Sequence, residues 1–458
     1  MNTPISRREL LRILSAAGLG TAFASRLVAD ESDSAPRVAA GKVPELKLIP
    51  VAGKSRFPAR LVDGKVIQPE RTLPILHETD VLVVGGGPAG FAAAVAAARA
   101  GAKTVIAERF GYFGGQWTGG LVLVVISTHA KENGQKVQVC RGIGGDLLDR
   151  LSKINGAILN YEPGKHNPTT DPEATKFMMD EMIAEAGVKV FLHSWAADVV
   201  MEGDVVRGAV FESKSGRQAI LAKVVVDATG DGDIFAAAGA EFEQRLHAIG
   251  LVHRLGNVDR ADMEKLKAAG FRSLGGAEPI TSARWVNLRG PSTDALDVNE
   301  LSRLEMEHRR SIWNHVQKLR NSPGGDKVFL LQTAPQLGVR TSRLLGAVKQ
   351  LTYAESREPK KFPDTVAVGG AQGAQHAGWP IPYGCLVPKK LDGLLAAGRC
   401  ASMDEKLCED MRLIAACLIT GHAAGAAAAL AVQSKCLPRD VEIPKLQKLL
   451  TDQGAYLG

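Results

Sequence analysis

The segment from residue 80 to 108 constrains the fold of this chain more than any other. Asp80–Val84 is a short apolar strand, and the glycine-rich turn Gly85–Gly90 follows it directly. Phe91–Ala100 is nearly all alanine and predicts a helix, and Lys103–Ala107 predicts a second strand. The order strand, glycine turn, helix, strand is typical of the first unit of a parallel sheet that binds a dinucleotide.

Each glycine of this turn has a physical task. Gly85 makes the tight turn, Gly87 lets a pyrophosphate approach the backbone, and Gly90 lets the helix pack closely on the sheet. The helix N-terminus offers free N–H groups and a partial positive charge to the phosphates. Glu108, at the end of the second strand, is placed to hydrogen-bond the adenosine ribose. A bare glycine pattern is weak evidence, but here strand, helix and acid agree, so we predict dinucleotide binding.

A second glycine-rich stretch, Arg109–Gly120, continues directly from the acid. A simple NAD domain normally enters its next helix at this point. A glycine-rich turn here resembles flavoproteins of the glutathione-reductase type, in which it runs beneath the FAD pyrophosphate toward the ring. The resemblance favours FAD as the cofactor, with an ordinary loop as the alternative.

Later segments extend the resemblance over about residues 78–457. The chain resembles the FAD-dependent oxidoreductase family, in which a GG-x-x-T-x-G loop follows the ribose acid. The other segments similar to that family are Asp171–Val188, Val224–Asp233, Gly338–Arg343, Leu394–Cys400, Arg412 and Gly421–Gly425. The resemblance implies a FAD-binding fold and leaves the substrate open, because the family is chemically broad.

The resemblance also implies which residues hold the cofactor. They come from the first glycine turn, from the acid and the loop after it, and from strand ends further along the chain. The predicted FAD-binding residues are Gly85, Gly87, Pro88, Ala89, Gly90, Glu108, Arg109, Gly115, Gln116, Thr118, Ala196, Ala228, Thr229, Gly230, Gly398 and Arg399. We predict no metal site, because the six cysteines show no ligand spacing.

Residues that act on a substrate should lie near these FAD segments. His376, in a Gly/Pro-rich linker before the chain returns to the FAD domain, is the predicted catalytic base, with a structural histidine as the alternative. The family often has an acid shortly before this histidine, where Ala374 and Gln375 stand instead. Arg340, three residues from Arg343, is predicted to bind a substrate carboxylate or oxyanion, with an interdomain salt bridge as the alternative.

Arg412 is the third predicted catalytic residue. It lies at the start of a helix of about residues 412–432 that carries Gly421, Gly425 and many alanines. Small residues should let this helix lie close to the sheet and aim its N-terminus at the flavin. The helix dipole and the Arg412 charge would then stabilise negative charge at N1/O2 of reduced flavin, with a surface salt bridge as the alternative.

Several other residues and motifs define the remaining possibilities. His253 and Arg254 are weaker candidates in the substrate domain, and Trp117 and Tyr383 are candidate pocket walls or core residues. The sequence has no second strand–glycine turn–helix unit, which argues against a built-in NAD(P)H site. It has no C-x-x-C, so a redox dithiol is not expected.

The N-terminus resembles an export signal. Ser6–Arg12 holds an arginine pair followed by leucines, and the apolar stretch Ile13–Ala29 comes next. This order resembles the twin-arginine signal, which exports proteins already folded, and an amphipathic first helix is the alternative. The stretch is short for a membrane span, and Arg26 interrupts it. We expect a periplasmic or secreted protein with no stable membrane insertion of the mature chain.

Length and composition set the expected domain organisation. A chain of 458 residues exceeds one compact core, and 45% hydrophobic residues exclude wholesale disorder. We expect an α/β protein with a discontinuous Rossmann-like FAD domain and an inserted α+β substrate domain. The predicted parts are a signal (1–29), an extension (30–74), the FAD domain (75–130, 185–240 and 380–435), a helical segment (131–184), the substrate domain (241–379) and a C-terminal helix (436–458).

These predictions lead to one favoured function and several alternatives. The favoured hypothesis is an exported FAD-dependent dehydrogenase or oxidase that transfers hydride between a small polar substrate and flavin N5. Its expected partners are an external electron acceptor (oxygen, a quinone or a redox protein) and the twin-arginine export machinery. The alternatives are fumarate-reductase-like reduction of an activated double bond, a lyase or isomerase without net redox, and a non-catalytic binding module. A modest net charge of +7 and 5% aromatic residues argue against a nucleic-acid partner.

Overall fold

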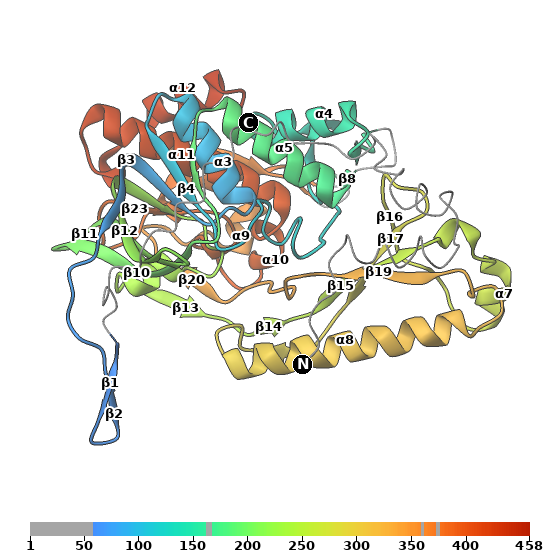
Figure 1. Cartoon of the computed structure of the whole chain (residues 1–458). Coiled ribbons are helices and arrows are strands. Elements are labelled where there is room, and N and C mark those ends of the chain that lie inside the picture. The colour runs from blue at the N-terminus through green and yellow to red at the C-terminus, as the bar shows by residue number, and fades with distance from the viewer. Residues whose placement is uncertain (1–57, 162–166, 359–360, 372–375) are drawn as a thin grey trace, which may run out of the picture. The chain divides into compact units, whose positions relative to one another are not determined.

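The computed structural model describes residues 58–161, 167–358, 361–371 and 376–458 (Figure 1). The predicted export signal and most of the predicted extension lie outside these residues. The chain divides into two compact units, 1–71 and 72–458. The described part of the first unit is a hairpin of β1 (Arg60–Val62) and β2 (Lys65–Ile67), which turns at Asp63 and Gly64 with positive φ angles.

A seven-stranded sheet forms the centre of the second unit, in the order β10-β11-β12-β3-β4-β9 with β23 paired to β12. Its strands are β3 (Ile75–Val84), β4 (Thr104–Ala107), β9 (Lys189–Phe191), β10 (Trp195–Glu202), β11 (Val205–Ser213), β12 (Gly216–Asp227) and β23 (Leu394–Ala396). The strands β23, β12, β3, β4 and β9 are parallel, and β10–β12 form an antiparallel meander. This sheet, built from distant parts of the chain, confirms the predicted discontinuous Rossmann-like α/β fold.

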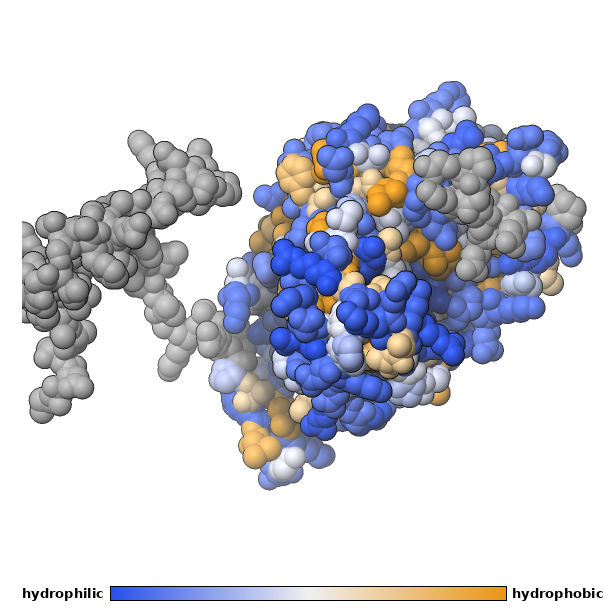
Figure 2. Space-filling model, turned by 90° about the vertical axis from the view of Figure 1, so that its right-hand side faces the viewer, coloured by the Kyte–Doolittle hydropathy of each residue, from blue (hydrophilic) through white to orange (hydrophobic). Residues whose placement is uncertain are grey.

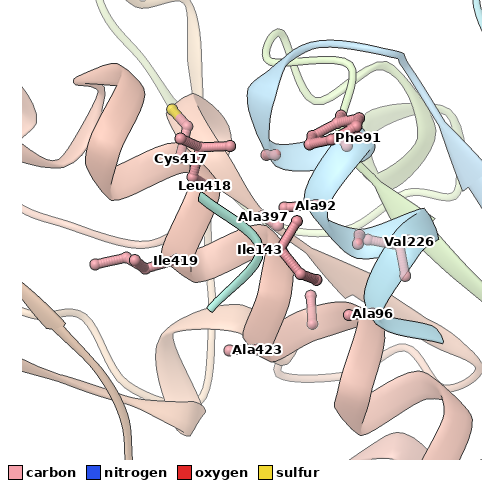
Figure 3. Close-up of a cluster of buried hydrophobic side chains, with 14 of the residues drawn as sticks. Phe91, Ala92, Ala96, Ile143, Val226, Ala397, Cys417, Leu418, Ile419 and Ala423 are labelled. Atoms are coloured by element: carbon pink, nitrogen blue, oxygen red, sulfur yellow. The ribbon is translucent and has the colours of Figure 1, made fainter. Parts of the chain in front are cut away.

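A layer of helices lies above this sheet in the view of Figure 1. The helices are α3 (Pro88–Arg99), α4 (Ile143–Lys153), α5 (Pro172–Glu185), α11 (Ile414–Ser434) and α12 (Ile443–Asp452). Two of them contact the strands of the sheet, and the others pack on those two helices. Figure 3 shows Phe91 and Ala92 of α3 in the same apolar cluster as Leu418 of α11. A Cβ on Gly421 would lie 2.0 Å from the Ala89 carbonyl oxygen. The glycines of α11 therefore meet helix α3, while the helix as a whole also contacts β12 and β3 of the sheet, as we expected.

Helix α11 is also the one helix in the described part of the chain that is long and apolar enough to be compared with a membrane span. By length and composition it could cross a membrane, but 94% of its most apolar stretch is buried inside the protein. Its alanines and glycines bring it into contact with α3, α4, α12 and β12. Its composition is therefore that of a central core helix.

The second core belongs to an inserted antiparallel sheet in the order β16-β17-β15-β19. Its strands are β15 (Leu251–Gly256), β16 (Gly276–Ala277), β17 (Arg284–Leu288) and β19 (Phe329–Thr333). Helix α8 (Val298–Arg320) packs against it through buried residues such as Leu304 and Ile312, and runs along the lower edge of Figure 1. Helix α7 (Met263–Ala268) lies at the same end of the molecule, where Figure 2 shows a mostly hydrophilic surface. We call this sheet and its helices the cap.

The cap is shorter than the predicted substrate domain of 241–379. The first core is the apolar cluster around α3 and α11. Leu344, Val366 and Trp379 are buried in this core. Strand β21 (Thr365–Gly369), paired with β22 (Trp379–Pro382), contacts α11 and α12. The chain thus rejoins the FAD domain before Leu344, because these later apolar residues pack on its helices.

The remaining short elements complete the second unit. The predicted helical segment 131–184 also contains strands, since β5 (His129–Glu132) pairs with β6 (Gln135–Gln138) and β7 (Ala157–Ile158) with β8 (Thr169–Thr170). The other elements are α6 (Asp233–Ala237), β13 (Phe242–Gln244), β14 (His247–Ala248), η1 (Val258–Arg260), β18 (Ser292–Thr293), β20 (Arg343–Leu345), α9 (Tyr353–Ser356), η3 (Tyr383–Leu386), η4 (Gly398–Cys400), α10 (Cys408–Met411) and η5 (Pro438–Asp440).

Candidate functional site

A cavity of about 330 Å³ lies at the carboxyl ends of the central parallel strands. One wall is formed by the first glycine turn, Glu108 and the loop after it, the turn Ala228–Gly230 after β12, and the residues around the start of α11. The cap strands β15 and β17 and the segment between β19 and β20 also line the cavity. Open α/β sheets bind their ligands at this edge.

The first glycine turn is shaped to hold phosphate. Gly85 has φ +99°, and a Cβ there would lie 2.5 Å from the Ala228 carbonyl oxygen. A Cβ on Gly90 would lie 1.7 Å from the Gly85 carbonyl oxygen, so this glycine sets the approach of α3 to the strand. Gly87 lines the cavity and precedes α3, whose N-terminus has no side-chain cap. The first N–H groups of α3 therefore remain available to an anion in the cavity.

Glu108 lies at the end of β4 and lines the cavity. Its two carboxylate oxygens accept hydrogen bonds from the N–H groups of Gly86 (2.5 Å) and Phe110 (2.8 Å). Burial raises the pKa of Glu108 above its ordinary value, against the lowering effect of these hydrogen bonds. Each oxygen retains a lone pair, so the group can still accept a hydrogen bond from a ribose hydroxyl. Arg109, beside it, lies 4.9 Å from the Phe110 ring and 5.0 Å from the Trp195 ring.

The turn after β12 is fixed by two carboxylates that sequence reasoning did not select. Asp227 is fully buried and accepts hydrogen bonds from the Thr229 hydroxyl (2.7 Å) and from two N–H groups at the start of α6. Burial raises its pKa to about 6. Asp231 pairs with Arg399 at 2.8 Å and accepts a hydrogen bond from Ser342 at 2.6 Å. Arg399 lines the cavity, and its ion pair with Asp231 compensates part of its positive charge.

Arg340 and Arg412 both line the cavity, as expected of the predicted catalytic residues. Arg340 donates to the Ala248 carbonyl oxygen at 2.5 Å. Arg412 follows α10, pairs with Glu409, and has a buried Nε with no hydrogen-bond partner among the described residues. Arg343 does not line the cavity. It pairs with Asp233 at 3.1 Å, so of the two neighbouring arginines it is the one that forms a salt bridge.

His376 does not lie in this cavity. Its side chain is exposed, it is not among the lining residues, and its carbonyl oxygen accepts a hydrogen bond from the Lys131 N–H at 2.8 Å. It follows the undescribed residues 372–375. The linker pattern could not predict on which side of the sheet the histidine emerges, and its position gives no support for its role as the base.

Three predicted FAD-binding residues do not line the cavity but contact residues, loops or helices that do. Gly90 packs against Gly85, and Thr118 donates to the Phe113 carbonyl oxygen at 2.6 Å, which closes the second glycine loop. The N–H of Gly398 donates to Thr420 at 3.1 Å. Ala196 lines a smaller neighbouring cavity that also contacts Glu108. The remaining predicted FAD-binding residues line the main cavity, namely Gly85, Gly87, Pro88, Ala89, Glu108, Arg109, Gly115, Gln116, Ala228, Thr229, Gly230 and Arg399.

The apolar lining is the part that sequence reasoning missed. Val122, Val124 and Ile126 line the cavity, while Leu123 and Val125, between them, are buried in the two cores. This period of two is typical of an extended segment with two buried faces, and the apolar run after the second glycine loop could have predicted it. The other missed lining residues include Val252, Trp285, Asn287 and Gln336.

Three of the other candidates from the sequence have structural partners, whereas His253 is buried outside the cavity lining with neither ring nitrogen hydrogen-bonded among the described residues. Trp117 lines the cavity and donates to Thr170 at 2.8 Å, whereas Tyr383 is in the core and donates to the Pro438 carbonyl oxygen at 2.7 Å. Arg254 is buried and paired with the buried Glu278 at 2.5 Å. These contacts favour core roles for Tyr383 and Arg254.

The comparison with known proteins agrees with this geometry. The model of the family described as FAD dependent oxidoreductase matches residues 80–282 and 254–450. This chain belongs to that family. The FAD-dependent oxidoreductase is 31% identical over 166 residues to the thiamine thiazole synthase of Methanococcus vannielii, which is 34% of this chain and 57% of that protein.

Other similarities of this FAD-dependent oxidoreductase are partial or distant. The thiamine thiazole synthase of Metallosphaera sedula is 30% identical over 179 residues, covering 36% of this chain and 59% of that protein. The chain thus spans little more than half the length of these relatives. A geranylgeranyl bacteriochlorophyll reductase-like protein from Thermoplasma acidophilum aligns over 83% of this chain and 84% of its own, with 18% identity and a TM-score of 0.43.

The cofactor of this FAD-dependent oxidoreductase is FAD, and the cavity fits it. The uncapped N-terminus of α3 would hold the pyrophosphate, Glu108 the ribose, and the second glycine loop with Gly115 and Gln116 would lie beside the remainder. The buried Oε1 of Gln116 has no partner among the described residues, so a hydrogen-bond donor is needed there. The start of α11, where Leu413 and Ile414 line the cavity, carries no side-chain cap either.

Proposed function

We propose that this FAD-dependent oxidoreductase is a dehydrogenase or oxidase that takes hydride from a small substrate and hands the electrons to an external acceptor. FAD, when bound, supplies the hydride-accepting chemistry. The observation that carries the proposal is the pair of unlike walls of one cavity. The cofactor motifs form one part of the wall, and the cap with Arg340 forms another, so groups from the cap face the same cavity as the cofactor motifs.

The side chains of the cavity support binding and polarisation of that substrate. Arg340 and Arg412 can hold and polarise a substrate oxygen. Trp285 and Val124 give this space apolar side chains. Burial raises the pKa of Cys417 to about 12, so this lining thiol is protonated at neutral pH. Among the described lining residues, Glu108 is then the one carboxyl group, and it lies with the cofactor motifs, so we propose that the substrate proton leaves to water.

An anaerobic titration tests the proposal. The purified holoenzyme is mixed without oxygen with hydroxy acids, sugars and amines, and the flavin absorbance at about 450 nm is followed. Bleaching by one class identifies the electron donor and supports a dehydrogenase or oxidase. A flavin that no donor bleaches, but whose reduced form is rapidly reoxidised by an activated alkene, would replace the proposal by the reductase alternative.

The same assay tests the predicted base. His376→Ala protein with normal FAD content should be compared with wild type at several pH values. A bleaching rate equal to that of wild type would remove His376 from the mechanism. A slow rate that recovers at high pH would support its role.

We also propose that the chain is exported by the twin-arginine route. The support is the order Ser6–Arg12 and Ile13–Ala29 in the sequence. Cells that express wild type and the double variant Arg7→Lys, Arg8→Lys should be fractionated. We expect wild type in the exported fraction and the variant inside the cell, and equal distribution of both would contradict export by this signal.

A further inference from the structure

Arg340 and Arg412 both line the cavity, and the protein supplies only part of their counter-charge. Among the described residues, Arg340 makes no ion pair, and its recorded partner is the Ala248 carbonyl oxygen. Arg412 pairs with Glu409, but its Nε is buried without a partner. Arg340 donates to Ala248, and the Glu409 partner of Arg412 is hydrogen-bonded to the adjacent His247, so the two arginines lie in the same neighbourhood. Burial and the charges of Arg412 and the exposed Arg289 lower the pKa of Arg340, and the charge of Glu409 opposes this lowering.

We propose that the substrate of this site is an apolar monocarboxylate whose carboxylate bridges Arg340 and Arg412. The inference rests on the proposed function and specifies its substrate class. A carboxylate accepts charge-assisted hydrogen bonds from two guanidinium groups at once and removes their mutual repulsion. A neutral ligand would leave the buried Nε of Arg412 with a weaker partner and the two charges unbalanced.

The rest of the cavity fits an apolar body. Val124 and Ile126 line it from the segment after the second glycine loop, and Val252 and Trp285 line it from the cap. The Trp285 indole N–H is buried without a partner among the described residues, and Asn287, exposed, lines the cavity beside it. A sugar, with hydroxyls all round, would meet mostly apolar side chains there, so the lining favours an aliphatic or aromatic acid.

Glu409 is the positioning residue of this arrangement. Its carboxylate accepts hydrogen bonds from Arg412 and from His247 in β14, at 2.5 Å for His247. Burial raises the pKa of Glu409, but the hydrogen bonds from His247 and Arg412 outweigh it and hold the pKa at about 2. Glu409 is therefore anionic at neutral pH and fixes the guanidinium of Arg412, while the buried Nε of Arg412 has no hydrogen-bond partner among the described residues.

Equilibrium binding to the oxidised holoenzyme tests the proposal without any turnover. Calorimetry should compare non-reactive arylcarboxylates with the primary amides of the same acids. One charge-assisted bidentate contact corresponds to roughly tenfold to hundredfold in affinity, so wild type should prefer the carboxylate by about that factor. Equal affinity for acid and amide would overturn the proposal, whatever the variants do.

The variants assign the preference to the two arginines. Arg340→Gln and Arg412→Gln should each lose most of the preference for the carboxylate and keep the affinity for the amide. Arg289→Gln is the matched control, because it removes a nearby positive charge from a residue that does not line the cavity. An effect of Arg289→Gln as large as that of Arg340→Gln would overturn the bridging geometry, since general electrostatics would then explain it.

Glu409 gives a second, independent readout. Glu409→Gln should weaken carboxylate binding and leave amide binding unchanged, and Glu409→Asp should restore part of the loss. If Arg412→Gln changes FAD affinity but not the acid preference, Arg412 serves the cofactor and the proposed bridge is wrong. Failure of the proposed function would give a different result. Carboxylates would still bind with the described preference, but no donor would bleach the flavin.

Discussion

Gly87 and Gly90 lie in the same glycine turn, but their surroundings give them different tasks. A Cβ on Gly90 would lie 1.7 Å from a backbone oxygen, which the structure cannot accommodate without moving α3. A Cβ on Gly87 would find its nearest neighbour at 4.0 Å, and φ there is −67°, which alanine adopts readily. Gly90 therefore serves the fold, and Gly87 serves the ligand.

The pair of alanine variants separates these tasks. Gly87→Ala should fold with an unchanged free energy of unfolding but bind FAD about tenfold more weakly, the effect of one lost contact to phosphate. Gly90→Ala should lower the free energy of unfolding of the apoprotein by about 1–3 kcal/mol or more. Denaturant unfolding and FAD titration of both variants check this. Equal FAD affinity of Gly87→Ala and wild type would contradict the phosphate assignment.

His422 predicts part of the pH dependence of stability. It is buried, its Nε2 lies 2.7 Å from Gln453, and burial lowers its pKa from 6.5 to about 4. The unfolded chain therefore takes up a proton between pH 6.5 and 4 that the folded chain does not, and stability falls as the pH falls through this window. His422→Gln should reduce the loss of unfolding free energy between pH 7 and pH 5 by roughly 2 kcal/mol. An unchanged loss would show that His422 titrates normally.

At the scale of elements, the contact between α3 and α11 depends on two glycines. A Cβ on Gly421 would lie 2.0 Å from the Ala89 carbonyl oxygen, and one on Gly425 would lie 2.1 Å from that of Ala93. Gly421→Ala should lower the free energy of unfolding by about 1–3 kcal/mol, in spite of alanine's higher helix propensity. Ser434→Ala, exposed at the end of the same helix, is the control and should change it little. A stabilised Gly421→Ala protein would contradict the close approach.

The cap sheet is tied by a buried ion pair. Arg254 in β15 is bidentate to Glu278 and lies 3.7 Å from Asp171, the N-cap of α5. Arg254→Met should destabilise the protein by roughly 3–5 kcal/mol, because Glu278 is left as an uncompensated buried charge. The double variant Arg254→Met, Glu278→Met should recover most of that loss in thermal unfolding. A double variant as unstable as the sum of the singles would contradict this account.

The sequence predicted the elements that local pattern determines. The β3–α3–β4 unit is present with Glu108 at its end, because strand period, alanine content and glycine turn agree over a short stretch. The sequence analysis predicted the end of the substrate domain too far along the chain. The apolar run around Trp379 could belong to either domain by its pattern, and only its packing in the core of α11 assigns it to the FAD domain. The sequence also predicted that α11 lies close to the sheet, which it does, but not that its two glycines meet α3. Both the end of the cap and the contact made by the α11 glycines depend on packing between distant segments, which local sequence patterns do not show.

At the scale of the whole molecule, most predicted cofactor residues converge although they are spread from Gly85 to Arg399. Parallel pairing brings the ends of β3, β4, β12 and β23 to one edge, which places their turns around one cavity. The cap wall could not be predicted in this way. Val252 and Trp285 are ordinary strand residues, and only the docking of the cap turns them toward the cofactor side. The position of His376 likewise depends on how a linker between domains packs, which local sequence does not determine.

The flavin content of the purified protein tests the central claim most directly. The holoenzyme should be denatured, and the released flavin identified and quantified against the protein. The structure predicts FAD at one equivalent per chain, and the Gly87→Ala variant should retain less after dialysis. A wild-type protein that is folded by circular dichroism, yet colourless and unable to take up added FAD, would contradict the assignment of this cavity.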